Sequence, residues 1–270
     1  MKTRLLLFAV VTMLLLGSTM SVNAITYTTI GFKAIDTDGT NVIGEYSGGK
    51  FLYNMNTHAW TTLDLPGTLT GISGSNIVGT YWDDTLHANR GFIYDSLGWI
   101  TLNFPGASNT SISGVDGDNI VGTADGHSVI YNLNSQIWNT FDVSGALFTT
   151  VLDIDNGNII GYYKESDEIS SKGFFYDGTD FYDLPVTPYA ISGRNVVVLY
   201  AGIYNLDSQS MILTNNAFGF SGQIIGISGD TVVGWYKDNA LHGFIATIPE
   251  PATLLLLSLG AAFLRKKESV

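Results

Sequence analysis

The sequence predicts an all-β protein, a β-propeller of about six four-stranded blades that is closed by its N-terminal strand. Three observations predict this fold. The pattern GISGSNIVGTYW at Gly71–Trp82 recurs at intervals typical of a propeller blade, two further strand-like segments follow most copies, and the two ends of the repeat region complement each other. The repeat domain spans residues 25–247 of the 270-residue chain.

Each copy of the pattern indicates a strand, a tight turn and a second strand. Gly, Asn, Asp and Ser in the turns favour short hairpins, and the β-branched pair after the turn favours a buried strand. A looser copy, Ala34–Ser47, has two extra residues in its turn. The close copies are Gly71–Trp82, Gly114–Asp125, Asp153–Lys164, Ala190–Ala201 and Gly226–Lys237.

A glycine recurs inside the second strand of the pattern. Because glycine normally destabilises a strand, its recurrence predicts a close backbone approach or a β-bulge. Val198 takes this place in one copy, and the successive positions lie 35 to 43 residues apart. The glycines are Gly44, Gly79, Gly122, Gly161 and Gly234.

The third and fourth strands of a unit are represented by Phe92–Asp95 and Trp99–Leu102. The last unit ends at Ile245–Thr247 without a fourth strand, whereas Ile25–Ile30 is a strand without a unit. We therefore expect the N-terminal strand to complete the last blade, which would remove the exposed edges of an open sheet. The alternative, a stacked solenoid, would need distinct capping units at its ends.

The composition restricts the compartment and the partners. Residues 25–248 contain seven Lys or Arg and 22 Asp or Glu, a net charge of −15, which argues against a nucleic-acid partner. The chain has no cysteine, so neither a disulfide framework nor a cysteine metal site is available. Acidic turns that keep an exported protein soluble account for the charge equally well.

The N-terminal segment, residues 1–24, predicts a secretory signal peptide. Lys2 and Arg4 precede an apolar run, Leu5–Leu16, and small residues lead to a predicted cleavage after Ala24. The alternative is an uncleaved anchor helix, although the run is shorter than the roughly 20 residues that a membrane span needs. The mature chain would begin at Ile25.

The C-terminal segment, residues 248–270, has three parts. A Pro-Glu-Pro step precedes a short apolar stretch, Ala252–Leu264, which predicts a short transmembrane helix. The basic end would remain on the cytoplasmic side. The step is Pro249, Glu250 and Pro251, and the basic end is Arg265, Lys266 and Lys267.

This tail, PEPATLLLLSLGAAFLRKK, resembles a PEP-CTERM sorting signal. The resemblance implies recognition of Pro249, Glu250 and Pro251 by an exosortase, an integral-membrane processing enzyme that removes the helix. It also implies an exported protein, transiently anchored in the inner membrane and then delivered to the cell envelope, outer surface or extracellular matrix. An ordinary C-terminal membrane anchor is the alternative.

The repeats resemble the extracellular HAF repeats of exported proteins. His242-Gly243-Phe244 is similar to their His-Ala-Phe or His-Gly-Phe step, and Gly226–Tyr236 is similar to their glycine-containing hairpin. Arg90 and Lys172 replace the histidine in two other units, which argues against a common role for it.

Candidate sites are few. Asp36, Asp38 and Asn41 alternate around a glycine as calcium ligands do, but Asp and Asn are also expected in a hairpin turn. We therefore predict no cofactor, with calcium at these residues as the alternative. The histidines His58, His87, His127 and His242 lack metal-site spacing, and no catalytic motif is present.

The tryptophans divide into two groups. Trp60, Trp99 and Trp138 recur in phase with the repeat, which favours packing in the core over stacking on sugars. Trp82 and Trp235 lie beside polar residues and are the better candidates for the surface.

Taken together, the sequence predicts a non-enzymatic protein of the cell surface or exopolysaccharide matrix. Its propeller would serve as a structural domain or bind extracellular polysaccharide or a surface protein. The alternative is a secreted carbohydrate-active hydrolase or lyase, because carboxylates from separate blades can converge at the centre of a propeller.

Overall fold

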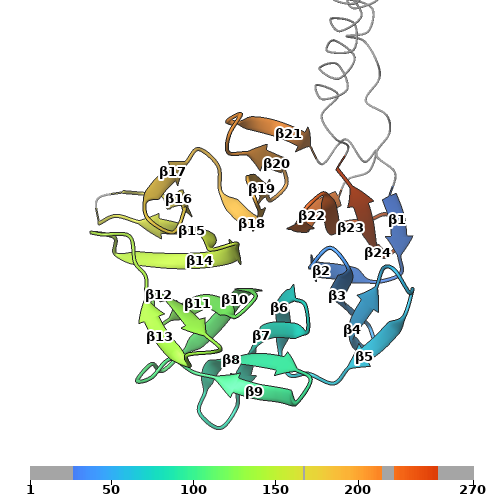
Figure 1. Cartoon of the computed structure of the whole chain (residues 1–270), viewed down its shortest axis with the longest axis horizontal. Coiled ribbons are helices and arrows are strands. Elements are labelled where there is room, and N and C mark those ends of the chain that lie inside the picture. Colours follow the sequence, from blue (N-terminus) through green and yellow to red (C-terminus); the bar gives the residue numbers. More distant parts are fainter. Residues whose placement is uncertain (1–26, 167, 215–221, 249–270) are drawn as a thin grey trace, which may run out of the picture.

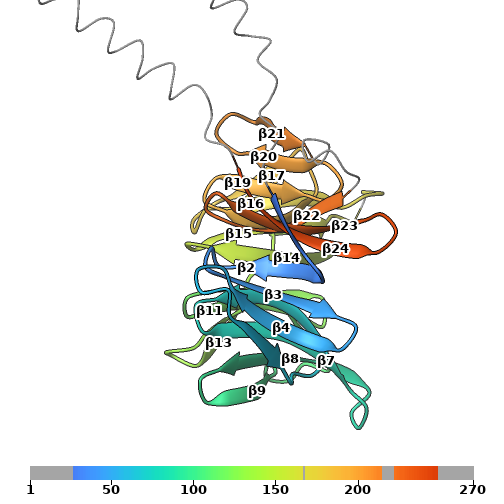
Figure 2. The same ribbon diagram turned by 90° about the vertical axis from the view of Figure 1, so that its right-hand side faces the viewer.

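The chain folds as a ring of six four-stranded antiparallel sheets (Figure 1). The structure is a computed structural model, and it describes residues 27–166, 168–214 and 222–248. These residues contain strands and no helix. Figure 2 shows the ring edge-on. The predicted all-β propeller is confirmed, while the predicted signal peptide and C-terminal helix lie outside the described residues.

The blades follow the chain in order, each beginning with its innermost strand. The first two blades contain β2 (Lys33–Thr37), β3 (Asn41–Tyr46), β4 (Gly49–Asn54), β5 (Trp60–Leu63), β6 (Thr68–Ser73), β7 (Asn76–Asp83), β8 (Ala88–Asp95) and β9 (Gly98–Leu102). The third and fourth contain β10 (Thr110–Asp116), β11 (Asn119–Ala124), β12 (His127–Asn132), β13 (Ile137–Thr140), β14 (Phe148–Asp155), β15 (Asn158–Lys164), β16 (Lys172–Tyr176) and β17 (Phe181–Leu184). The fifth and sixth contain β18 (Pro188–Ser192), β19 (Asn195–Val198), β20 (Gly202–Asn205), β21 (Ser210–Thr214), β22 (Gly222–Ser228), β23 (Thr231–Lys237), β24 (Leu241–Thr247) and β1 (Tyr27–Ile30).

The N-terminal strand closes the ring as expected. β1 pairs antiparallel with β24, from Tyr27 opposite Ala246 to Ile30 opposite Gly243. Ile30 is buried in a cluster that joins the last blade to the first. The last blade therefore contains both ends of the repeat domain, and its outer strand comes from the opposite end of the chain.

The first repeat is the same length as the others, so the predicted two-residue insertion in its turn is wrong. Asp36 pairs with Ile43 as Gly71 pairs with Val78, and in both repeats the strand glycine follows one residue later. The copy therefore begins at Asp36 rather than at Ala34. Sequence similarity alone matched Ala34 to Gly71, whereas backbone pairing sets the register.

The glycine inside the second strand makes the predicted close approach. A Cβ atom on Gly79 would lie 2.2 Å from the carbonyl oxygen of Thr68 and 2.5 Å from the ring of Phe92, its partner on the third strand. The facing inner strand also carries a β-bulge here, between Leu69 and Gly71. Both predicted explanations thus apply at one place in the blade.

The hydrophobic core is divided among the six interfaces between neighbouring blades. The cluster between the fifth and sixth blades contains ten buried residues, whereas the cluster between the fourth and fifth contains four. Those four are Ile160, Phe175, Ile191 and Val196. Among the described residues, the interface between blades four and five thus has the smallest buried cluster.

Two of the three outer-strand tryptophans, Trp60 and Trp99, are less buried than predicted, whereas Trp138 is partly buried and packs against the cluster between the second and third blades. Trp60 is 40% exposed and Trp99 is 44% exposed. Trp60 stacks on Phe51 with ring centroids 4.2 Å apart and also contacts Phe32, with centroids 4.1 Å apart, so its indole packs on aromatic rings while part of it stays exposed. An outermost strand has no further strand beyond it, which explains the exposure. Trp82 is 54% exposed, as expected for a surface residue.

Candidate functional site

The innermost strand of each blade carries one β-bulge at the same position. The bulges follow Ala34, Leu69, Ile112, Val151, Pro188 and Ile224. A bulge changes the direction of neighbouring side chains, and bulges are frequent beside functional sites. Six bulges at one level therefore form a ring around the axis of the propeller.

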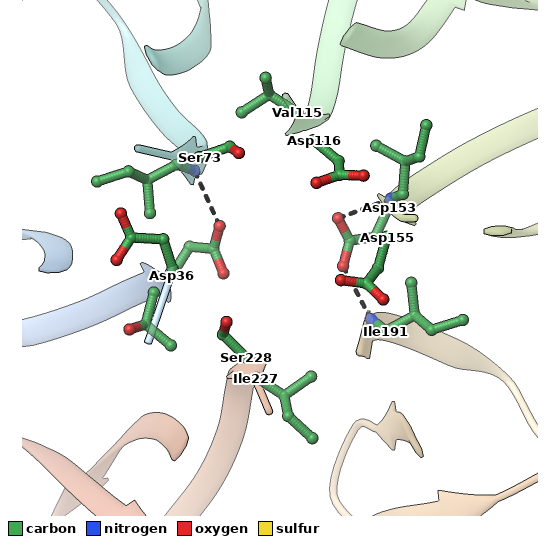
Figure 3. Close-up of a pocket in the computed structure, with 13 residues that line it drawn as sticks. Asp36, Ser73, Val115, Asp116, Asp153, Asp155, Ile191, Ile227 and Ser228 are labelled. Atoms are coloured by element: carbon green, nitrogen blue, oxygen red, sulfur yellow. Dashed lines mark hydrogen bonds between the residues drawn. The ribbon is translucent and has the colours of Figure 1, made fainter. Parts of the chain in front are cut away.

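The residue after each bulge is small in four blades and an aspartate in two. Gly71, Gly114, Ala190 and Gly226 are the small residues. Asp36 in the first blade and Asp153 in the fourth take the same place. Because the first and fourth blades of a six-bladed ring lie opposite each other, the two carboxylates face one another across the centre (Figure 3).

Each of these aspartates connects its own blade to the next one. Oδ2 of Asp36 accepts a 3.0 Å hydrogen bond from the backbone N–H of Ile72. Oδ2 of Asp153 accepts a 2.8 Å hydrogen bond from the N–H of Ile191, and its Oδ1 accepts one from Ile154. The pair therefore joins blade one to blade two and blade four to blade five.

The small residues provide space for the carboxylates. A Cβ atom on Gly114 would lie 2.7 Å from Oδ1 of Asp153, and one on Gly226 would lie 3.0 Å from Oδ1 of Asp36. The blade that precedes each aspartate therefore needs a glycine here, whereas the blades that follow carry Gly71 and Ala190. The aspartates of the first and fourth blades and the glycines of the sixth and third blades are thus one coordinated arrangement.

Two cavities meet at Asp36 and Asp153. The turn-side cavity has a volume of about 140 Å³ and is also lined by Asp38, Asp116 and Asp155. The bulge-side cavity has a volume of about 300 Å³. It is lined by the residue inside each bulge, namely Ile35, Thr70, Ser113, Leu152, Tyr189 and Ile225. The exposed surface of the two aspartates faces these cavities, so the pair marks the boundary between an acidic end and a more apolar end.

Enclosure in the centre of the ring changes the acidity of the pair. Burial raises the pKa of Asp36 to about 7, although the hydrogen bond from Ile72 opposes the change. Burial, and next the negative charge of Asp36, raise the pKa of Asp153 well above its usual range. The pair therefore holds a proton more readily than exposed aspartates do.

A second set of contacts links the turns at the acidic end. Oγ of Ser73 accepts the N–H of Gly117 at 3.0 Å, and Oδ2 of Asp116 accepts the N–H of Asn156 at 2.7 Å. In the same way, Oδ2 of Asp155 accepts the N–H of Gly193 at 2.7 Å. Oγ of Ser192 accepts the N–H of Gly229 at 2.9 Å.

The first blade does not take part in this set of turn contacts. The N–H of Gly39 donates to Oγ1 of Thr37 in its own turn. Asp38 likewise accepts the N–H groups of Thr40 and Asn41 within that turn. The links between turns therefore run from the second blade to the sixth.

Residues 247–267 match the PEP-CTERM protein-sorting motif. This motif implies that an exosortase recognises the chain and that the protein is exported towards the cell envelope. The matched range includes Pro249, Glu250, Pro251 and the three basic residues that the sequence analysis selected, all outside the described residues. No helix of the described part of the chain is long and apolar enough to cross a membrane.

Outside the sorting motif, the similarity found to other proteins is similarity of fold. No curated protein is similar in sequence to this chain. The β-propeller domain of the Trilobed protease from Pyrococcus furiosus superposes with a TM-score of 0.49 at 12% identity, covering 81% of this chain and 82% of that one. An acylaminoacyl peptidase from Pyrococcus horikoshii gives 0.47 at 10% identity, covering 82% and 46%. Similarity this low supports no statement about activity.

The candidate calcium ligands are only partly brought together. Asp36 and Asp38 line the same cavity, but Nδ2 of Asn41 donates to Oδ2 of Asp38 and its Oδ1 accepts from Asn54. Among the described residues, no group of three or more His, Asp or Glu side chains is placed to hold a metal ion. The prediction of no cofactor, with calcium at these residues as the alternative, stays a prediction.

The histidines make local contacts in different blades. Nδ1 of His58 lies 2.8 Å from the hydroxyl of Tyr53, and Nδ1 of His127 lies 2.8 Å from Oδ2 of Asp142. Nε2 of His242 lies 3.0 Å from Oδ1 of Asp238.

Sequence analysis did not identify the opposed pair Asp36 and Asp153. The signal was present, because an aspartate stands where four other repeats have Gly or Ala. The misplaced start of the first copy concealed it, since it aligned Asp36 with Ser73 rather than with Gly71.

Proposed function

We propose that the mature protein is a non-enzymatic component of the cell envelope or exopolysaccharide matrix, whose propeller binds glycan or protein or serves as a structural unit. The observation that carries this proposal is the sorting motif, which begins at the final residue of the last strand. Ile248 still packs in the core, and its N–H donates to the carbonyl of Asp230 at 2.7 Å. A cut beyond Ile248 would therefore leave every strand of the propeller in place.

The centre of the ring supports a structural role for the paired aspartates. Their oxygens accept backbone N–H groups of neighbouring blades, which is the bonding of an inter-blade link. The turn-side cavity, at about 140 Å³, is smaller than the ~300–1,000 Å³ typical of ligand sites, and the bulge-side cavity, at about 300 Å³, lies at the lower limit of that range.

The test is the intact mass of the full-length protein recovered from the envelope and the medium of an exosortase-containing host. We expect the wild-type chain to end near Pro249–Pro251. Glu250→Ala should leave the chain extending through Val270, while Glu268→Ala, which lies outside the matched residues, should be processed normally. An unprocessed wild-type chain that remains in the membrane would mean that the tail is a plain anchor.

A carbohydrate-active hydrolase or lyase is the second candidate function. The observation that favours it is the pair Asp36 and Asp153, opposed carboxylates with raised pKa values, since such pairs also serve as general acid and base. If soluble polysaccharides are cleaved by the wild-type protein and not by Asp36→Asn or Asp153→Asn, the enzymatic function is correct. Asp142→Asn is the matched control, because Asp142 lines neither of the two central cavities.

A further inference from the structure

A surface groove opens between the fourth and fifth blades. It has a volume of about 530 Å³, within the range of ligand sites, and lies where the buried inter-blade cluster is smallest. One wall comes from β16, β17, the turn between them and the loop that follows. The other wall comes from β20, from the turn before β19 and from the turn after β20. The incomplete filling of this interface produces the groove.

A guanidinium group is held in place on one wall. Arg194 lies over the ring of Phe175, with Cζ 5.0 Å from the ring centroid, and its Nε donates to Oδ1 of Asp207 at 2.9 Å. These two contacts orient the planar group and leave both Nη atoms for other partners. The Arg194 side chain is 46% exposed, so these donors are accessible.

Acceptors and an aromatic face lie on the opposite wall. Tyr182 is 49% exposed, and its hydroxyl donates to Oδ2 of Asp177 at 3.1 Å. Hydrogen bonds from the backbone of Asp180 and Thr179 hold the pKa of Asp177 below its usual range, so this carboxylate stays ionised. Asp183 accepts the hydroxyl of Tyr163 through Oδ1, which leaves Oδ2 available.

This combination selects a ligand by chemistry. The groove offers fixed donors, ionised acceptors and an exposed ring within one cavity. Three carboxylates, Asp177, Asp183 and Asp207, disfavour an anion, and a wholly apolar ligand would leave the charged groups without partners. A ligand ring that carries hydroxyl groups and an apolar C–H face fits all three features of the groove. Its hydroxyls can bond to the donors and the acceptors, and its C–H face can pack against the exposed aromatic ring.

We propose that this groove binds a neutral sugar unit of an extracellular polysaccharide, with Tyr182 against the ring and with Arg194, Asp177 and Asp183 bonded to its hydroxyls. The inference rests on the proposed function and specifies its ligand and its site. In the described part of the chain, the groove residues do not contact Asp36 or Asp153 at the centre of the ring.

The experiment measures binding of the protein recovered from the exosortase-containing host to a panel of oligosaccharides by isothermal titration calorimetry. The panel contains neutral hexasaccharides of glucose, mannose, galactose and N-acetylglucosamine, together with an oligogalacturonate. We expect saturable binding to at least one neutral sugar, and about tenfold weaker binding for Tyr182→Ala and for Arg194→Met. Trp82→Ala, which removes a similarly exposed aromatic from another blade, should leave the dissociation constant unchanged.

Several outcomes would overturn the proposal. Binding to the oligogalacturonate alone would contradict the neutral ligand, and binding that Trp82→Ala abolishes would place the site elsewhere. Absence of binding to every neutral sugar would exclude the site while leaving sorting of the protein, tested by mass, unaffected. Thermal unfolding of each variant shows whether a loss reflects misfolding, and Tyr182→Phe, which keeps the ring, should retain most of the affinity.

Discussion

Val198 and Gly202 are cross-strand partners in the fifth blade, and their sizes are reversed relative to the same pair in four other blades. In those blades a glycine on the second strand faces a phenylalanine on the third, as Gly79 faces Phe92. The large side chain thus moves to the other strand while the space between the strands remains filled. The exchange explains why one repeat lacks the glycine and still forms a blade.

Adding a methyl group to the strand glycine should destabilise the fold. In Gly79→Ala the new Cβ would meet the carbonyl oxygen of Thr68 at 2.2 Å and the ring of Phe92 at 2.5 Å, so backbone atoms must move. We expect the free energy of unfolding to fall by roughly 1–3 kcal/mol, measured by urea denaturation. Gly31→Ala is the control, because no atom lies within 4 Å of its new Cβ. Equal stability of the two variants would contradict the packing argument.

Repeat spacing was sufficient to predict the fold. The blade number, the four strands of a blade and the closure by the N-terminal strand all follow from the regular spacing and from the unmatched strands at the two ends. Contacts across blades were harder to predict. The hydrogen bond from Ile72 to Asp36 joins residues 36 positions apart, and it depends on a register that only backbone pairing sets.

The groove residues were not predictable for a related reason. Phe175 and Arg194 belong to different blades, and their contact depends on how far one inter-blade space is filled. Each residue has an ordinary explanation in its own repeat. Their joint placement is a property of the assembled ring.

Ser192, in the turn of the fifth blade, should stabilise the ring more than Ser228, at the same position in the sixth blade. Oγ of Ser192 accepts the N–H of Gly229 from the next blade. The corresponding donor for Ser228 would be Gly39, but that N–H bonds to Thr37. Ser192→Ala should therefore lower the free energy of unfolding by about 1 kcal/mol and Ser228→Ala by less, in urea denaturation. A larger effect of Ser228→Ala would show that the turn contacts do not link the blades.

Replacement of Asp36 by asparagine should change how stability depends on pH. Because the folded state raises the pKa of Asp36 from 3.8 to about 7, it retains a proton that the unfolded chain releases. The contribution of Asp36 to stability therefore falls as the pH rises through this interval. Asp36→Asn keeps an oxygen for the N–H of Ile72 and has no charge, so it should be more stable than wild type at pH 8, by roughly 2 kcal/mol, and similar near pH 4.

The comparison uses thermal or urea unfolding of both proteins from pH 4 to pH 9. Taking the difference removes the effect of groups that titrate alike in both proteins, and it includes the change at Asp153, whose pKa the negative charge of Asp36 raises. Asp36→Ala is the second variant, because it removes both the charge and the acceptor and leaves the N–H of Ile72 unpaired. Asp36→Asn that is less stable than wild type at pH 8 would mean that the ionised carboxylate stabilises the ring.

Removal of the N-terminal strand should open the propeller. Without Tyr27–Ile30, β24 becomes an exposed edge, and its unpaired N–H and C=O groups would be available to another chain. The cluster between the last and first blades would also lose Ile30, which is 8% exposed in the closed ring. We expect a chain that starts at Gly31 to unfold at a lower temperature than one that starts at Ile25, and to form oligomers in size-exclusion chromatography.

A point variant separates the packing of this strand from its hydrogen bonds. Ile30→Asp leaves the backbone N–H and C=O groups of β1 unchanged but places a charge in the cluster. The strand should therefore detach from β24, and the protein should resemble the truncated chain. Thr28→Asp is the control, because Thr28 is exposed on the same strand. If the truncated chain and Ile30→Asp both remain monomeric and unfold at the wild-type temperature, the first and last blades hold together without β1. Closure by the N-terminal strand would then be dispensable for stability.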